Sequence, residues 1–215
     1  MSHAPNSRPS PAKSKARAQL DRQGWIDAAL KVLADQGVSG VRVESLAKAF
    51  GVTKGSFYWH FKDRSDLLEA MLHTWQEGRI LDIKKQTDAE TNTEPALATI
   101  DISEKTQAKA REQLRHVINL YSANRNRQGI AIELAVRAWA RHDTQAARVV
   151  EEVDNCRLQC TQKLFLANGL SESEAKSRSL LLYAYVFGQS LMSYDRYDLK
   201  INEFKRWIVE HIVTP

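Results

Sequence analysis

The sequence predicts an all-α protein in which a small N-terminal head of three helices precedes a larger helical bundle. Three observations lead to this fold class. Apolar residues recur at helical spacing in most segments of the chain. Gly51 separates two short helical segments, at a point where a positive φ would end the first of them. Polar capping patterns bound the later segments, such as the S-x-x-E of Ser171 to Glu174.

Length and composition place the chain among ordinary globular proteins. It has 215 residues, of which 43% are hydrophobic and 27% charged. This is enough for one domain, or for a small domain joined to a larger one. No apolar run approaches the ~20 residues of a membrane span, and the first residues lack the apolar core of a signal peptide. We therefore expect a cytoplasmic protein that does not enter a membrane.

Positive charge is concentrated near the N-terminus. Residues 1–64 contain 11 Lys and Arg against 5 Asp and Glu, a net charge of +6, whereas residues 65–215 contain 20 against 21. Such a placement favours a polyanionic partner for the N-terminal part. Residues 1–18 are rich in Pro, Ser, Ala and basic residues and predict a disordered arm. This basic arm either lies along DNA or remains a solvated tail.

The segment at residues 42–61 organises the head. Its first helix has an apolar face formed by Val43, Leu46, Ala47 and Phe50. Gly51 is the predicted turn, and Thr53 is suited to cap a second helix from Lys54 to about His60. A helix, a short glycine turn and a second helix make up the helix-turn-helix, whose second helix enters the major groove of DNA.

The second helix of this segment has one buried side and one side suited to contact a nucleotide. Phe57 and Phe61 lie four residues apart and are expected to anchor it in the core. We expect Lys54, Gly55 and Ser56 to face base edges. We expect phosphate contacts mostly from the remaining candidates, which are Arg42, Thr53, Tyr58, Trp59, His60 and Lys62.

The run GVTKGSFYWHF, from Gly51 to Phe61, resembles the signature of the tetracycline-repressor (TetR) family of bacterial transcription regulators. Ile26–Leu30 with Gly37 resembles that family's first helix, and Asp63–Leu68 the start of its fourth. Arg42 is a departure, because family members often have Ser or Thr there as a helix cap.

The resemblance covers residues 19–79 and implies a DNA-binding domain there, followed by a ligand-binding and dimerisation domain at residues 80–215. It implies a homodimer that binds double-stranded DNA at a near-palindromic operator, with half-sites one helical turn (~10 bp) or more apart. It also implies repression that a small-molecule effector relieves. The protein would then be a sequence-specific transcriptional repressor.

The rest of the chain predicts further helices. Apolar spacing and capping residues predict them at about 18–36, 63–86, 107–124, 128–141 and 144–167, from 171 onward, and after a cap at Asp198. Residues 87–106 are interpreted as a loop with one short helical turn. The last two helices have more apolar surface than one domain would hide, which indicates an association surface. The candidate interface residues are Leu182, Val186, Phe204 and Ile208.

An effector pocket is implied by the resemblance and not by any motif in the body. Aromatic and polar side chains commonly line such pockets. The candidates are Trp75, His116, Tyr121, Trp139 and Phe165. For each of them, packing in the core is the competing interpretation.

Other chemistry finds little support in the sequence. It contains no catalytic constellation and no metal-binding motif, so we expect a regulator and no enzyme, with no cofactor and no metal. Cys156 and Cys160 lie four residues apart on an apolar stripe. They are interpreted either as small buried hydrophobic residues or as a thiol sensor. Two alternatives to a small-molecule effector therefore stay open, namely control by a protein partner and control by thiol chemistry.

Overall fold

The computed structural model describes residues 20–87, 103–122, 127–192, 196–198 and 200–214. Within these ranges the chain is helical and contains no strand, which confirms the predicted all-α class. None of the helices in the described ranges is both long and apolar enough to cross a membrane. The predicted basic arm at 1–18, and residues 88–102 of the predicted loop, lie outside the described residues.

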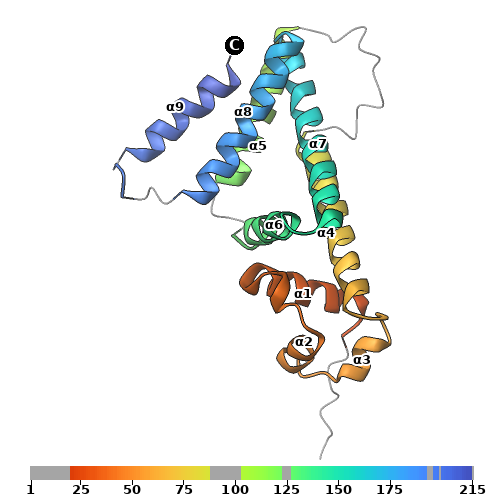
Figure 1. The fold of residues 1–215 in the computed structure, drawn as a ribbon. Helices are drawn as coiled ribbons and strands as arrows, with labels where there is room; N and C mark the ends of the chain where they lie inside the picture. The colour runs from red at the N-terminus through yellow and green to blue at the C-terminus, as the bar shows by residue number, and fades with distance from the viewer. Residues whose placement is uncertain (1–19, 88–102, 123–126, 193–195, 199, 215) are drawn as a thin grey trace, which may run out of the picture.

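The head forms the lower end of the molecule in Figure 1. It is built from four short elements, α1 (Arg22–Gln36), the 3-10 turn η1 (Val38–Gly40), α2 (Val43–Ala49) and α3 (Lys54–Tyr58). α1 begins four residues later than predicted because Asp21 is its N-cap, accepting a hydrogen bond from the Gly24 amide at 2.7 Å. Gly51, the predicted turn residue, has a φ of 65°, and Gly37, the C-cap of α1, has a φ of 69°, so both need the freedom of glycine.

The body extends from the head along one long helix, α4, which is continuous between the two (Figure 1). Its helices are α4 (Arg64–Gln86), α5 (Glu104–Ser122), α6 (Arg127–Ala140), α7 (Thr144–Ala167), α8 (Glu172–Leu191) and α9 (Ile201–Val213). α7 packs along α4, and α6 packs against both α7 and α1 of the head. The head therefore meets the body through α4 and through the α1–α6 contact.

Capping explains most of the helix boundaries in the body. Asp143 caps α7 by accepting from the Ala146 amide at 2.9 Å, and the predicted capping box of Ser171 and Glu174 is present on α8. The predicted cap at Asp198 is wrong, because α9 begins later, with Lys200 at the N-cap position. The Asp198 carboxylate instead accepts from the Lys200 amide at 2.7 Å.

Two buried clusters hold the chain together. The first joins the head to α4, α6 and the first half of α7, and the second joins α5, the end of α7, α8 and α9. A cluster of ion pairs, the buried charge group, links α6 to α7. Arg157, with 1% of its side chain exposed, pairs with the buried Glu133 at 2.7 Å. Arg137 pairs with Glu133 at 2.9 Å, as the four-residue spacing predicts, and also with Asp154.

Apolar spacing in the last helix predicts a buried stripe of Ile201, Phe204, Trp207, Ile208 and Ile212, and the structure buries only part of it. Val209, Ile212 and Val213 are buried, whereas Phe204 and Trp207 on the predicted stripe are exposed. The reason is that α9 packs mainly against α5 and α8. Phe50, expected on the buried face of α2, is also partly exposed, since it lies at the end of that helix.

Candidate nucleic-acid interface

The second helix of the helix-turn-helix, α3, is fixed to the head by aromatic packing. Phe57 is fully buried and meets Trp25 of α1 edge-on, with ring centroids 5.3 Å apart. Phe61 stacks on Phe57 at 5.3 Å, and the Arg22 guanidinium lies over the Phe61 ring at 5.0 Å. Both predicted anchors are therefore in the core. They limit which side of α3 can face outward.

The turn before α3 is also closed by local hydrogen bonds. Thr53 caps α3 as predicted, because its hydroxyl accepts from the Ser56 amide at 3.2 Å. The helix ends at Tyr58, two residues before the predicted end. Its short length leaves the residues that follow in the connection to α4, at the outer edge of the head.

Two aromatic side chains are strongly exposed at this edge. Tyr58 is 60% exposed and Trp59 85% exposed. An exposed tryptophan leaves a large apolar surface in water, which indicates contact with a partner. Lys62 is exposed and His60 half-buried nearby. Exposed aromatic rings and an exposed cation thus follow one another in the chain here, a combination that suits a polyanion.

Lys54 already has a partner on the neighbouring helix. Its ammonium donates to the Glu44 carboxylate of α2 at 2.7 Å, and both side chains are more than half exposed. The hydrogen bond from Lys54 lowers the pKa of Glu44. Lys54 must therefore exchange or share Glu44 before it contacts DNA. Sequence reasoning missed this pair, because residues ten apart meet only through the packing of α2 on α3.

Arg42 occupies the N-cap position of α2 and makes no capping bond with its side chain. Its Nε donates to the Ser39 carbonyl at 3.1 Å, and the side chain is exposed. The guanidinium thus remains available at the surface of the head, with more donors than this one bond uses.

Gly55 and Ser56, both predicted to face bases, differ in exposure. Gly55 is exposed, and a Cβ there would meet only the Thr53 hydroxyl, at 3.7 Å. The fold itself therefore does not require glycine in the interior of this helix. The Ser56 hydroxyl is buried, with no hydrogen-bond partner among the described residues. The predicted contact of Ser56 with a base edge would therefore require a different side-chain conformation.

Arg64 has a structural role that the sequence did not reveal. Its Nε donates to the Val41 carbonyl and its Nη2 to the Val38 carbonyl, each at 2.6 Å. Arg64 is the first residue of α4, so these bonds tie the start of α4 to the chain just before α2. The cation is therefore used within the head.

None of the predicted effector-pocket residues that the structure describes lines either of the two cavities described below. Trp75, Trp139 and Phe165 are buried in the two clusters, and His116 is exposed. The side chain of Tyr121 lies outside the described residues. Core packing therefore accounts for the three buried rings.

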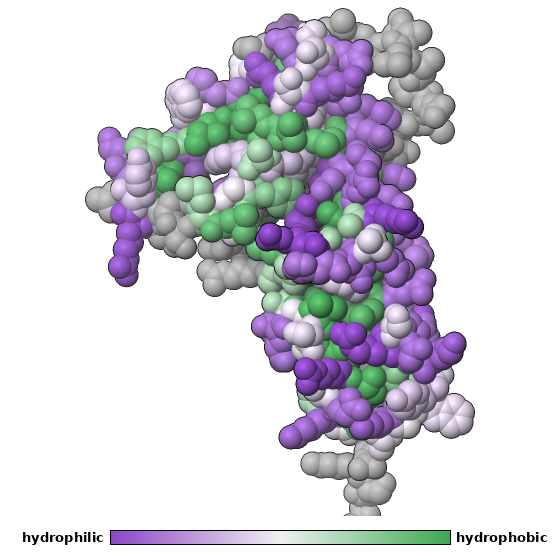
Figure 2. Space-filling view, in the orientation of Figure 1, coloured by the Kyte–Doolittle hydropathy of each residue, from purple (hydrophilic) through white to green (hydrophobic). Residues whose placement is uncertain are grey.

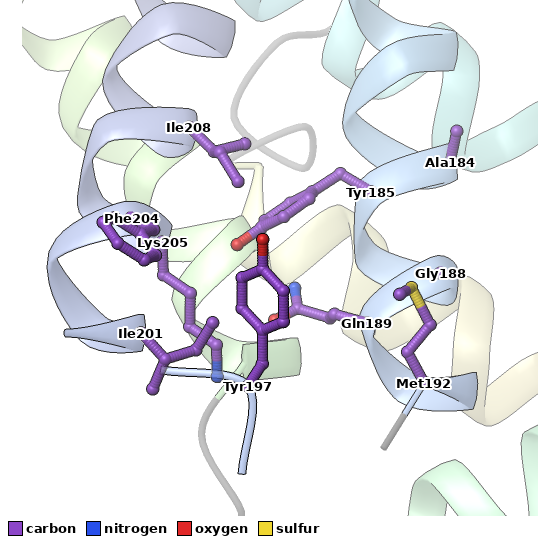
Figure 3. A pocket seen from close by; sticks show the side chains of 10 residues that line it. All are labelled: Ala184, Tyr185, Gly188, Gln189, Met192, Tyr197, Ile201, Phe204, Lys205 and Ile208. Carbon is purple, nitrogen blue, oxygen red and sulfur yellow. The ribbon is translucent and has the colours of Figure 1, made fainter. Parts of the chain in front are cut away.

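Two cavities are present elsewhere in the body. One of about 530 Å³ lies between α8 and α9, where apolar side chains from the two helices face each other (Figure 3). A second, of about 120 Å³, is lined by residues of α4, α5, α6 and α8, including Arg79, Asp82, Ile130, Glu133 and Phe187.

The four predicted interface residues divide into two pairs. Leu182 and Val186 are fully buried within the single chain, so in this conformation they cannot contact a second copy. Phe204 is 41% exposed, and Ile208 is half-buried; both line the larger cavity. The correction has a simple cause, because a helix in an apolar run must bury one face in its own chain before it offers another.

An exposed helix-turn-helix on a basic head, joined to an all-α body, defines a DNA-binding transcriptional regulator. Residues 26–71 match the model of the "bacterial regulatory proteins, tetR family". The chain is 53% identical to the HTH-type transcriptional regulator AcrR of Shigella flexneri over 55 residues, 26% of each chain. It thus spans about a quarter of that relative.

Longer matches agree with this class. The chain is 36% identical over 98 residues to the uncharacterized HTH-type transcriptional regulator TtgW of Pseudomonas putida, which is 45% of this chain and 73% of the relative. The structure of the multidrug binding protein EbrR, complexed with imidazole, has the same fold, with a TM-score of 0.52, 22% identity and coverage of 90% and 95%. The chain belongs to the TetR family of transcriptional regulators.

Proposed function

We propose that this regulator is a repressor that binds a near-palindromic operator as a homodimer and is released by a small-molecule effector. In this proposal residues 19–79 are the DNA-binding domain, and residues 80–215 bind the effector and dimerise. Effector binding would favour a conformation with the wrong spacing between the two heads. The affinity of the repressor for DNA would fall by the difference between the effector's affinities for the two conformations, and by no more.

The observation that carries the proposal is the outward face of α3 and the turn after it. Trp59 and Tyr58 are exposed beside Lys62, while Lys54 is held at the surface by a single exposed ion pair. Phosphates can replace the Glu44 carboxylate as the partner of Lys54 without exposing a buried group. This arrangement suits a DNA backbone and base edges better than a protein surface.

Selection from random duplex DNA tests the operator. The purified full chain is mixed with the duplexes at moderate salt, and bound fragments are sequenced. We expect an inverted repeat whose halves are about 10 bp or more apart, with an affinity that falls steeply as salt rises. If Arg42 contacts a phosphate, Arg42→Ala should make the affinity for DNA fall less steeply as the salt concentration rises. The absence of enrichment over random sequence would contradict sequence-specific binding.

Exposed apolar residues on the last two helices support the homodimer. Leu180, Leu181 and Leu191 on α8 are each more than half exposed, and so is Trp207 on α9. Figure 2 shows hydrophobic side chains gathered over this part of the molecule. A second copy seated on the same face would remove this surface from water and would cover the larger cavity.

A matched pair of substitutions tests the dimer. Leu181→Asp should shift the protein to a monomer in sedimentation at micromolar concentration, with an unchanged helical spectrum. Leu81→Asp is the control, since Leu81 is 45% exposed and belongs to α4, which is not one of the two helices of the proposed interface. A Leu181→Asp variant that remains a dimer would contradict this interface. Val186 is unsuitable, because a charge there would unfold the core.

The smaller cavity is our candidate for the effector site. Its lining includes Glu133, on the helix that packs against α1 of the head, and Arg79 and Asp82 on α4, which leads to the head. Arg79 and Asp82 pair at 2.6 Å, and Ile130 and Phe187 supply apolar walls. A ligand here would contact both connections between body and head.

Release of an operator probe by fragment-sized aromatic compounds tests this site. A compound that releases the native protein should fail on Ile130→Phe, which fills the cavity, while operator affinity without the compound stays the same. Ala138→Phe is the control, because Ala138 is exposed on α6, the helix that also contains Ile130. Leu181→Glu is unsuitable as a control because it alters the proposed dimer interface. Release that survives Ile130→Phe would place the effector elsewhere.

A further inference from the structure

Two thiols lie side by side where the end of α4 packs against α7. Cys156 and Cys160 are free cysteines four residues apart on α7, and each is partly accessible. Both pack against the first buried cluster, to which Ile83 near the end of α4 also belongs. They are therefore reachable by a small reagent while lying against the helix that leads to the head.

The surroundings of the pair make the two sulfurs unequal. A hydrogen bond from Cys156 lowers the pKa of Cys160 to about 6, against the effect of burial, with help from Thr87 and from the charges of Lys163 and Lys84. The hydrogen bond to Cys160, together with burial and the neighbouring thiolate, raises the pKa of Cys156. The surroundings therefore favour a thiolate on Cys160 over one on Cys156.

Metal binding explains this arrangement less well than oxidation. Structural zinc and similar sites need about four ligands. Among the described residues, no group of three or more His, Cys, Asp or Glu side chains is placed to hold a metal. A thiolate with an adjacent thiol is instead the arrangement in which a sulfenic acid is resolved to a disulfide.

We propose that Cys160 and Cys156 form an oxidant-sensitive dithiol that reacts with hydroperoxides. The Cys160 thiolate attacks one peroxide oxygen, so that an S–O bond forms and the O–O bond breaks. The leaving oxygen takes a proton and departs as water or an alcohol, which leaves a sulfenic acid on Cys160. The Cys156 sulfur then attacks the Cys160 sulfur, an S–S bond forms, and the hydroxyl leaves as water with the Cys156 proton.

Helix geometry makes the product strained and therefore reversible. Residues four apart on a helix have Cβ atoms about 5–6 Å apart, whereas a disulfide needs about 3.5–4.5 Å. Closing the bond must pull the backbone of α7 together between Cys156 and Cys160. Strained disulfides of this kind are easily reduced and are typical of regulatory pairs.

The strain would act on α4. The Thr87 hydroxyl lies next to Cys160, and its one proton is shared between that sulfur and the Ile83 carbonyl, 2.8 Å away in the last turn of α4. A distortion of α7 therefore reaches the helix that continues to the head. This part of the inference rests on the proposed function. We expect oxidation to weaken operator binding by about 5-fold or more, which is the usual range of coupling between distant sites.

Mapping the oxidation products of the folded full chain tests the chemistry. After treatment with hydrogen peroxide, peptide mass spectrometry should find a Cys156–Cys160 disulfide. Cys156→Ser should stop at a sulfenic acid on Cys160 that dimedone traps, whereas Cys160→Ser should leave Cys156 unreacted at the same dose. Circular dichroism checks that both variants fold. A native protein without the disulfide, or equal reactivity of Cys156 in Cys160→Ser, would overturn the dithiol.

Operator titrations before and after peroxide test the regulatory part. The native protein should lose about 5-fold or more in affinity and regain it with dithiothreitol, while the double variant Cys156→Ser/Cys160→Ser should not respond. A mapped disulfide with unchanged affinity would overturn the coupling to DNA binding. A reduced protein that binds no DNA would overturn the proposed function instead, and the mapped disulfide would still decide the dithiol.

Discussion

Two exposed tryptophans belong to regions of very different character. Trp59, after α3, is 85% exposed and has Lys62 and Tyr58 near it in the chain. Trp207, on α9, is 62% exposed, stacks on His211 at 3.6 Å and shares its helix with the exposed Phe204. Exposure of a large ring indicates a partner in both cases, but the neighbouring side chains indicate which: a polyanion for the head and an apolar protein surface for α8 and α9.

The two regions also differ in what holds them together. The head relies on aromatic packing of Trp25 on α1 against Phe57 and Phe61, and on helix caps close in sequence. The body contains a buried charge group in which Arg157 meets Glu133, 24 residues away. The head is thus stabilised by apolar burial and the α6–α7 junction by ion pairing, and each can be tested separately.

The largest effect should come from the buried charge group. Arg157→Ala leaves the Glu133 carboxylate buried with Arg137 as its remaining ionic partner. Removing one member of a buried pair typically costs about 3–5 kcal/mol of unfolding free energy. Urea unfolding followed by circular dichroism measures this loss. We expect the loss of helical signal to shift to a lower urea concentration.

A paired replacement is the control for this loss. Glu133→Leu with Arg157→Leu removes both buried charges, so it should lose less stability than Arg157→Ala alone. Arg137 keeps Asp154 as its partner in that variant. If the double variant is the less stable of the two, the α6–α7 junction owes its stability to the ion pair itself. The junction would then differ more strongly from the head, which is stabilised by apolar burial.

The sequence predicted the head better than the body because the head obeys local rules. The positive φ at Gly51, the cap at Thr53 and the anchors Phe57 and Phe61 all follow from residues close in sequence. The burial of Arg157 does not, because its partner on another helix is set by packing that one sequence does not reveal. The same holds for α9, where the burial of Val209 depends on α5 and α8.

A smaller effect is expected at the surface of the head. Lys54→Ala should weaken operator binding by about 1–3 kcal/mol and relax the preference for one base, if Lys54 reads a base edge. Fluorescence anisotropy against the selected operator and single-base variants measures both. An equal loss on every sequence would assign Lys54 to a phosphate contact instead.

Glu44→Gln provides the opposite test of the same contact. It removes the carboxylate that holds Lys54 at 2.7 Å, so Lys54 no longer exchanges one partner for another on binding. Affinity for DNA of any sequence should rise, because a negative charge near the phosphates is lost as well. Weaker binding would mean that Glu44 positions Lys54 for DNA and does not compete with it.

The site could be predicted as a set of residues but not as a geometry. The sequence could not show that Lys54 is paired with Glu44, or that the Ser56 hydroxyl is buried. Both depend on how α2 packs against α3 and on the rotation of α3 about its axis. Phe57 and Phe61 limit that rotation, yet two anchors alone do not decide it for a helix of five residues.

Gly55→Ala should separate stability from binding. A Cβ at this position meets only an ordinary contact at 3.7 Å, and alanine in a helix is favoured over glycine by roughly 0.5–1 kcal/mol. The variant should unfold at slightly higher urea concentration. It should nevertheless bind the operator more weakly, if DNA approaches the backbone there. Unchanged binding would leave the glycine without a role in the interface.

The smallest effect is a pH dependence that again contrasts the inside of the body with a surface pair. Burial opposes ionisation of Asp154, but the hydrogen bond from Arg137 and the charges of Arg137 and Arg157 outweigh it and lower its pKa. A carboxyl with a lowered pKa in the folded state adds stability above its ordinary pKa of about 3.9. That stability is lost as the pH falls through the folded value. Asp154→Asn should therefore flatten the acid side of the stability curve.

Glu172, paired with Lys176 on the surface of α8, is the matched comparison. Its pKa is also lowered, by the hydrogen bond from Lys176, but both side chains are largely exposed. Solvent and salt screen such a pair, so Glu172→Gln should leave the acid limb almost unchanged, and least changed at high salt. If Asp154→Asn and Glu172→Gln altered the pH dependence of stability equally, burial would not make the ion pairs of the α6–α7 junction stronger than a surface pair. The stability of that junction would then have to come from apolar packing, as in the head.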